Sequence, residues 1–172
     1  MQQQDREGRR GTFDRVALLY DRVRPGYPER LLDDMTALSG TRPGARVLEI
    51  GGGTRQASVP LAQRGYRVCG VERGANLAAV ARRNRAPDPG SEVHVGAFED
   101  WVVQRQAFDL AVSAQAFHWL DPAQAIPVVA WLGGAGIGGI QIVAQGPAPL
   151  AANVVLSTEL DVSPCREACY AS

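Results

Sequence analysis

The residues that could do chemistry begin with a glycine-rich segment at positions 47–56, with the sequence VLEIGGGTRQ. A short apolar strand that ends in glycines and leads into a helix is typical of a loop that binds a nucleotide cofactor. Glycines let the backbone approach a ligand closely because they carry no Cβ. Glycine-rich turns also close ordinary strands, so this segment alone leaves both interpretations open.

Glu72 is the second candidate. It ends a predicted strand and follows Gly51 by 21 residues. At this spacing a doubly wound fold presents an acid to ribose hydroxyls. A carboxylate there accepts hydrogen bonds from both hydroxyls and repels a 2′-phosphate. An acid at an exposed strand end is also common in any α/β protein, so Glu72 strengthens the cofactor interpretation without proving it.

Helix-like and strand-like segments alternate along the chain, which predicts a parallel α/β sheet. Pro28 suits the first turn of one helix, and Gly40 can end it. The predicted helices cover residues 13–23, 28–38, 57–64, 76–84 and 123–132. The predicted strands cover residues 46–50, 66–72, 92–97, 108–115 and 137–144.

Composition changes beyond Pro122, because no charged residue occurs from Pro122 to Thr158. A solvated helix normally shows a charged face. One interpretation is a fully buried segment. The other is that these residues did not evolve for this fold, as after a truncation or a change of reading frame.

Several motifs, taken in order, resemble the type-11-like, small-molecule family of class I S-adenosylmethionine-dependent methyltransferases. The N-terminal motifs FD at 13–14, YD at 20–21 and RPGYP at 24–28 resemble the family's cap. Residues 47–54 and Val71-Glu72 are similar to its first two motifs. The sequences FEDW at 98–101 and FDLAVSAQAFHWLDP at 108–122 resemble its later motifs. The resemblance covers residues of about 12–125.

The resemblance implies a Rossmann-like, doubly wound, mainly parallel sheet with helices on both faces. It implies S-adenosyl-L-methionine as cofactor and a small molecule as methyl acceptor. His118 would line the methyl-transfer cleft, as a general base or as a polar wall. Cofactor-binding residues would be Tyr20, Arg24, Glu49, Gly51, Gly52, Gly53, Glu72, Phe98, Glu99 and Gln115.

Three departures from the family pattern bear on activity. Arg55 stands where the third glycine of the loop belongs, and we expect its side chain to crowd the methionine moiety. Ala97 stands where many relatives carry an acid. Only five of the family's usual seven strands are recognisable, so we expect the last strands to be missing. A catalytically inactive binding or scaffold protein is therefore an alternative, and a nicotinamide-dependent dehydrogenase is a weaker one because Gln56 replaces its third glycine.

Charge and composition restrict the partners. The formal net charge is zero, which argues against nucleic acid. The cysteines, Cys69, Cys165 and Cys169, are odd in number and lack metal-like spacing, so we expect no metal and a reducing cytosol. The polar segment 1–11 does not resemble a signal peptide, and the apolar stretch 126–140 is short for a membrane span.

We expect three regions: a flexible N-terminus at 1–11, a methyltransferase-like domain at 12–144 and an atypical tail at 145–172. The fifth strand should lie at or near an edge of the sheet, and residues 154–160 could supply one more strand. An uncovered apolar edge is a template for association. We therefore expect self-association or poor solubility, and weak hydrogen-exchange protection of the tail.

Overall fold

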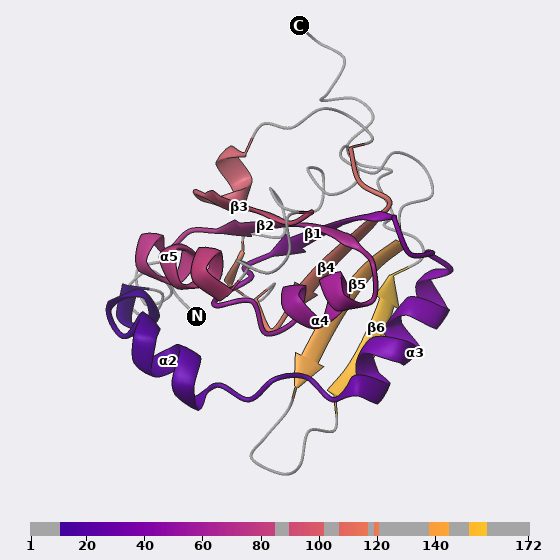
Figure 1. The fold of residues 1–172 in the computed structure, drawn as a ribbon, viewed down its shortest axis with the longest axis horizontal. Helices are drawn as coiled ribbons and strands as arrows, with labels where there is room; N and C mark the ends of the chain where they lie inside the picture. The colour runs from indigo at the N-terminus through magenta and orange to yellow at the C-terminus, as the bar shows by residue number, and fades with distance from the viewer. Residues whose placement is uncertain are drawn as a thin grey trace, which may run out of the picture.

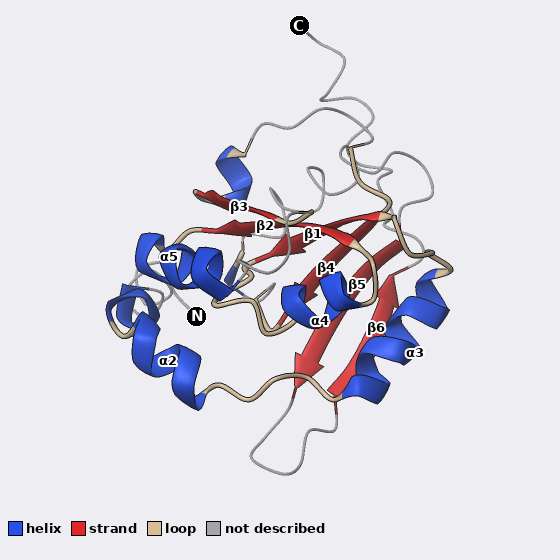
Figure 2. Cartoon of the chain, viewed as in Figure 1, coloured by secondary structure: helices blue, strands red, loops and turns tan. Residues whose placement is uncertain are grey.

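The computed structural model describes residues 11–84, 90–101, 107–116 and 119–120, and the backbone of residues 138–144 and 152–157 (Figures 1 and 2). Its helices are α2 (Ala17–Val23), α3 (Glu29–Ser39), α4 (Ser58–Gln63), α5 (Ala75–Asn84) and the 3-10 helix η1 (Phe98–Asp100). Its strands are β1 (Arg46–Ile50), β2 (Arg67–Glu72), β3 (Glu92–Val95), β4 (Leu110–Ala114), β5 (Gly138–Ala144) and β6 (Ala152–Ser157).

The strands form one sheet in the order β3-β2-β1-β4-β5-β6. Strands β1 to β5 are parallel, whereas β6 pairs with β5 in the antiparallel direction. The chain moves outward from β1 to β3 and then crosses back to place β4 on the other side of β1. In such sheets ligands bind in the crevice outside the carboxyl ends of the strands, at this reversal of strand order.

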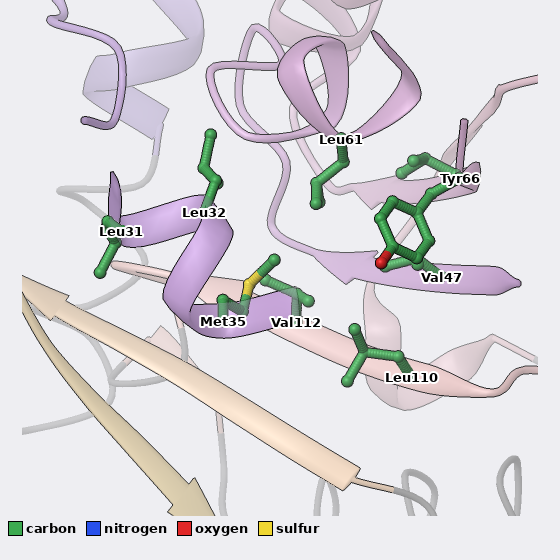
Figure 3. Packing of buried hydrophobic residues seen from close by; sticks show 9 residues of the cluster. Leu31, Leu32, Met35, Val47, Leu61, Tyr66, Leu110 and Val112 are labelled. Carbon is green, nitrogen blue, oxygen red and sulfur yellow. The ribbon is translucent and has the colours of Figure 1, made fainter. Parts of the chain in front are cut away.

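One face of the sheet packs against α3 and α4 (Figure 3). Side chains alternate across a strand, so Val47 of β1 and Leu110 and Val112 of β4 point to this face. Helix α3 covers them with a stripe at helical spacing, and α4 adds Leu61. The cluster consists of Leu31, Leu32, Met35, Val47, Leu61, Tyr66, Val68, Leu110 and Val112.

The opposite face carries a second apolar cluster, to which η1 contributes Phe98. On each strand, the residues of this second cluster alternate with those of the first cluster, so they point to the opposite face of the sheet. The cluster consists of Leu48, Ile50, Val71, Phe98, Phe108, Ala111 and Leu120. Burial on both faces explains why β1 and β4 read as nearly continuous apolar runs.

Helix α3 begins and ends where the sequence predicts. Pro28 precedes its first turn, and Gly40 follows its last residue with a φ of 64°. Glycine adopts this left-handed conformation without a Cβ penalty, so it ends the helix, and the amide of Gly40 donates to the carbonyl of Ala37.

Most predicted elements agree with the structure to within two residues. The fifth strand lies one strand from the edge of the described sheet, as predicted, and the extra strand is β6 at 152–157. The predicted helix at 123–132, the segment 1–10 and most of the tail lie outside the described residues, so the three-region division stays a prediction. Among the described residues, none of the helices has the length and apolar character that a bilayer crossing requires.

Leu32 tests the packing of α3, because it is fully buried whereas Leu38 on the same helix is 56% exposed. Leu32→Ala should lower the free energy of unfolding by about 2–5 kcal/mol, since it removes transfer energy and leaves a cavity. Leu38→Ala should change it by less than about 0.5 kcal/mol. Urea unfolding followed by circular dichroism measures both. Equal effects would show that α3 does not pack as described.

Candidate functional site

The glycine loop follows β1 in a conformation that its glycines require. Gly51 and Gly53 have φ values of 70° and 54°, in the left-handed region. A Cβ on Gly51 would lie 2.4 Å from the Cβ of Ala116, which follows β4. The carboxyl ends of β1 and β4 therefore approach so closely that only glycine fits.

Glu72 holds the loop from the end of β2. Its carboxylate accepts a hydrogen bond from the amide of Gly53 at 2.9 Å and another from the amide of Gly74 at 2.8 Å. Burial raises the pKa of Glu72, and these two bonds act in the opposite direction by stabilising the charged form. The acid predicted to face the ligand thus also fixes the loop that would cradle it.

Glu49 lies behind the loop, because it shares the face of β1 with Val47. It is 1% exposed, and the hydroxyl of Ser58 at the start of α4 donates a hydrogen bond to its carboxylate. Burial raises the pKa of Glu49 to about 7, with the charge of Glu72 adding to the rise. The bond from Ser58 and the positive charge of Arg55 act against it.

Arg55 occupies a glycine-like position, with a φ of 81°, and is only 3% exposed. The sequence predicts that it crowds a bound ligand. The structure instead buries the residue, and it is not among the described residues that line the cavity. Its positive charge lowers the pKa of Glu49.

The N-terminal segment is fastened to α5 at two points. Asp14 accepts hydrogen bonds from the amides of Asn76 and Leu77, at 2.8 and 3.0 Å, and so satisfies the first turn of α5. Asp21 accepts one from the side-chain amide of Asn84 at 2.9 Å. Ala17 packs between these points, so α2 runs beside α5 (Figure 1).

Asn84 also reaches the glycine loop. Its side-chain amide donates to the carbonyl of Thr54 at 2.8 Å as well as to Asp21. One side chain therefore joins the end of α5, the N-terminal segment and the loop. This bridge positions the wall formed by residues 13–24.

That wall is aromatic. The ring of Phe13 lies edge-on to Tyr20, with centroids 5.7 Å apart, and to Trp119 at 6.2 Å. The Arg24 guanidinium carbon lies 5.7 Å from the centroid of the Tyr20 ring. Burial raises the pKa of Tyr20, so its hydroxyl stays protonated and can donate a hydrogen bond at neutral pH.

A cavity of about 470 Å³ lies between this wall and the carboxyl ends of β1, β2 and β4. Eight of the ten predicted cofactor-binding residues line it: Tyr20, Arg24, Gly51, Gly53, Glu72, Phe98, Glu99 and Gln115. Glu49 and Gly52 do not line it. His118 lies outside the described residues, so its place stays a prediction.

The sequence interpretation missed several lining residues. Phe13, Asp14 and Trp119 line the cavity, together with Arg73 and Gly74. Ala97, where many relatives carry an acid, also lines it. Arg73 and Gly74 directly follow Glu72, which is the signal that could have found them, since the end of a strand at the switch point carries its neighbours to the same crevice. Trp119 directly follows His118 in the motif at 108–122, which is the signal that could have found it, and folding brings it beside Phe13.

The fold and the cavity define a class: a Rossmann-like α/β domain with a nucleotide-type ligand cavity at the reversal of strand order. Residues 48–130 match a family model described as a methyltransferase domain. Uncharacterized methyltransferases of Mycobacterium tuberculosis and Mycobacterium bovis are each 34% identical over 119 residues. The alignment covers 69% of this chain and 46% of each relative, so the chain spans about half their length.

Solved structures share the fold at low identity. A phosphoethanolamine N-methyltransferase of Haemonchus contortus has a TM-score of 0.67 at 20% identity, covering 87% of this chain and 38% of that one. A TehB-like methyltransferase of Corynebacterium glutamicum has a TM-score of 0.60 at 21% identity, covering 81% and 75%. A geranyl diphosphate C-methyltransferase of Streptomyces coelicolor has a TM-score of 0.58 at 16% identity, covering 66% and 44%. The chain therefore carries a methyltransferase domain over residues 48–130, with the fold of the class I S-adenosylmethionine-dependent methyltransferases.

Glu49 predicts a pH dependence of stability. Its pKa in the folded protein, about 7, lies above its ordinary value of 4.5. The stability from burying the protonated acid is therefore fully present below about pH 4.5 and is lost as the pH rises through 7. The free energy of unfolding should therefore fall by an amount on the order of 3 kcal/mol between the two pH limits. Urea unfolding of Glu49→Gln between pH 5 and 8 should lack this decline. An identical pH profile in both proteins would contradict the assignment.

The left-handed backbone conformation of Arg55 predicts a difference in stability between two variants at this position. Arg55→Ala removes the buried charge but keeps a Cβ at a φ of 81°, whereas Arg55→Gly removes both. The glycine variant should therefore be more stable than the alanine variant by up to about 1 kcal/mol, after the entropy of glycine in the unfolded chain is counted. Guanidinium unfolding of the two variants measures the difference. Greater stability of the alanine variant would rule out a left-handed residue 55.

Proposed function

We propose that this domain binds S-adenosyl-L-methionine in the cavity and transfers its methyl group to a small-molecule acceptor. One observation carries the proposal. A partly buried carboxylate, Glu72, ends β2 beside the cavity and is held in place by the amides of Gly53 and Gly74. An acid so fixed, next to a glycine loop at the switch point, suits the paired hydroxyls of a ribose.

The residues present fit this cofactor. Gly51 and Gly53 line the cavity without a side chain, which suits an amino-acid moiety lying against the loop. Their amides are held within the protein, that of Gly51 by the carbonyl of Val71 and that of Gly53 by Glu72. Glu72 already accepts two amide hydrogens, yet each carboxylate oxygen has a second lone pair for a hydroxyl. Glu49, behind the loop, adds negative potential below a positively charged ligand when it is ionised.

The remaining lining residues divide between the two ends of the cavity. Phe98 and Glu99 follow β3, beside Glu72, and would contact the adenine. Gln115 follows β4, where it would face the transferable methyl group. Tyr20 and Arg24 would close the cavity from the N-terminal segment, and the Arg24 guanidinium suits a carboxylate.

When bound, the cofactor supplies a methyl group that its positive sulfur makes electrophilic. The protein needs to align a nucleophile with it and exclude water. The wall of Phe13, Tyr20 and Trp119 is suited to exclude water from one side. His118 would accept the acceptor's proton, or else serve as a polar wall.

The neighbours support a small acceptor. The Streptomyces coelicolor protein was solved with geranyl diphosphate and S-adenosyl-L-homocysteine, and the Haemonchus contortus protein with phosphomonomethylethanolamine and S-adenosylhomocysteine. The cavity of about 470 Å³ lies in the range of sites for ligands of this size. A cytoplasmic location, the lack of nucleic-acid binding and self-association through the sheet edge stay predictions.

A catalytically inactive binding module is the second candidate, and Arg55 favours it. A buried cation offsets the charge of Glu49 and so weakens the attraction for a positively charged ligand. Titration with S-adenosylhomocysteine, combined with a methyl-transfer assay on the full chain, separates the two: tight binding without turnover under any acceptor tried would support the module.

Glu72→Ala should weaken S-adenosylhomocysteine binding by roughly 1–3 kcal/mol, because charge-assisted hydrogen bonds to the ribose are lost. Isothermal titration measures the affinity. Asp34→Ala is the matched control, since Asp34 is an exposed acid on α3 away from the cavity. Circular dichroism must show both variants folded. An unchanged affinity in folded Glu72→Ala would remove Glu72 from the site.

A further inference from the structure

Three side chains with metal-binding atoms meet on the sheet outside the cavity. Strand pairing places Cys69 of β2 opposite Glu92 of β3, and Val71 opposite His94. Paired residues on parallel strands point to the same face, and residues two apart on one strand do so as well. Cys69, Glu92 and His94 therefore share one face. None of the three lines the cavity.

Their ligand atoms are close enough for one ion. The Cys69 sulfur, a His94 nitrogen and a Glu92 oxygen all lie within 4.8 Å of one another. The Nε2 atom of His94 lies 3.4 Å from a carboxylate oxygen of Glu92. Bonds of about 2.0–2.3 Å place two ligands of a tetrahedral ion roughly 3.3–3.7 Å apart. Small rotations of these side chains would bring the three ligand atoms to bonding distance from one ion.

The surroundings suit a half-enclosed site. Cys69 is partly buried and packs against the second apolar cluster, and the ring of Trp101 lies 5.4 Å from that of His94. The side chains of His94 and Glu92 are 46% and 69% exposed, which leaves an entry path. One ligand is thus fixed by the core and two can adjust around an ion.

We propose that Cys69, Glu92 and His94 bind a divalent transition-metal ion of the Zn²⁺ class. Sulfur, imidazole nitrogen and carboxylate oxygen form the set that this borderline-soft ion prefers, whereas Mg²⁺ and Ca²⁺ prefer oxygen alone. Three protein ligands leave the fourth position to water.

Binding exchanges a proton for the metal. Burial, and after it the charge of Glu92, raise the pKa of the Cys69 thiol to about 12, so the thiol keeps its proton until the ion displaces it. The ion then links β2 to β3, the last strand on this side of the described sheet. A ligand that binds only the folded state stabilises it by mass action. The bound ion would therefore cross-link two strands. This metal site does not depend on the proposed function.

The test uses Co²⁺ as the probe, in the full chain carrying Cys165→Ser and Cys169→Ser so that Cys69 is its one thiol. One equivalent of Co²⁺ should produce the near-ultraviolet absorption of a thiolate–cobalt bond, and Zn²⁺ should displace it. Adding Cys69→Ser should abolish the band. Adding His94→Ala should weaken Zn²⁺ binding by roughly tenfold or more, since a ligand is lost. His118→Ala, at the chain's other histidine, should leave the band unchanged.

Two results would overturn the proposal: a band seen only when Cys165 and Cys169 are intact, or no saturable band at all. Because Cys69 is partly buried, thermal melting must show the Cys69→Ser variant folded. If it is not, the exposed His94→Ala variant decides alone, since unchanged Zn²⁺ affinity there refutes the site. S-adenosylhomocysteine titration of the Cys69→Ser and His94→Ala variants should give wild-type affinity, which keeps failure of the metal site distinct from failure of the cofactor site.

Discussion

The carboxylate of Glu72 bonds to two backbone amides that come from different loops, and the geometry of the cavity depends on this pair of bonds. Gly53 belongs to the loop after β1, and Gly74 to the loop after β2. Even partial burial of an acid costs free energy unless it is hydrogen-bonded, so the two amides offset the partial burial of Glu72. In return the carboxylate fixes both loops before any ligand arrives. Pre-organisation of this kind reduces the ordering cost of binding.

Charges behind the loop have a different role from those along the cavity. Glu49, Arg55 and Ser58 lie beneath it and are nearly inaccessible to water. The charges of Glu49 and Arg55 together set the electrostatic potential beneath the glycine loop, because electrostatic interactions are stronger where water is excluded. A substitution at residue 55 that removes the positive charge would therefore raise the pKa of Glu49 further, and Arg55 is not among the described residues that line the cavity.

Most of the fold could be predicted from local patterns. The apolar run at 46–50 and the glycines after it determine β1 and its loop, and Pro28 and Gly40 set the ends of α3. The sequence placed Glu49 at the ligand, yet strand alternation puts it on the same face as Val47, which packs against helices. That period of two was available as a signal. The position of Arg55 could not be found in this way, since the direction of a side chain in a left-handed turn follows from the folded loop.

The contributions of the N-terminal segment required the tertiary structure. Nothing near Asn84 shows that it joins Asp21 to Thr54, because these groups lie far apart along the chain. The same holds for Cys69, Glu92 and His94, since the register between β2 and β3 is set by the loop and helix that connect them. Sequence reasoning found residues that adjoin a motif and missed those that long-range pairing brings together.

The reversed direction of β6 has a practical consequence. Ser157 pairs with Gly139, at the beginning of β5. The backbone therefore leaves β6 at the end of the sheet where the parallel strands begin, opposite their carboxyl ends. The ligand cavity opens at those carboxyl ends. A fusion partner or surface anchor attached directly after Ser157 therefore starts from the end of the sheet remote from the cavity.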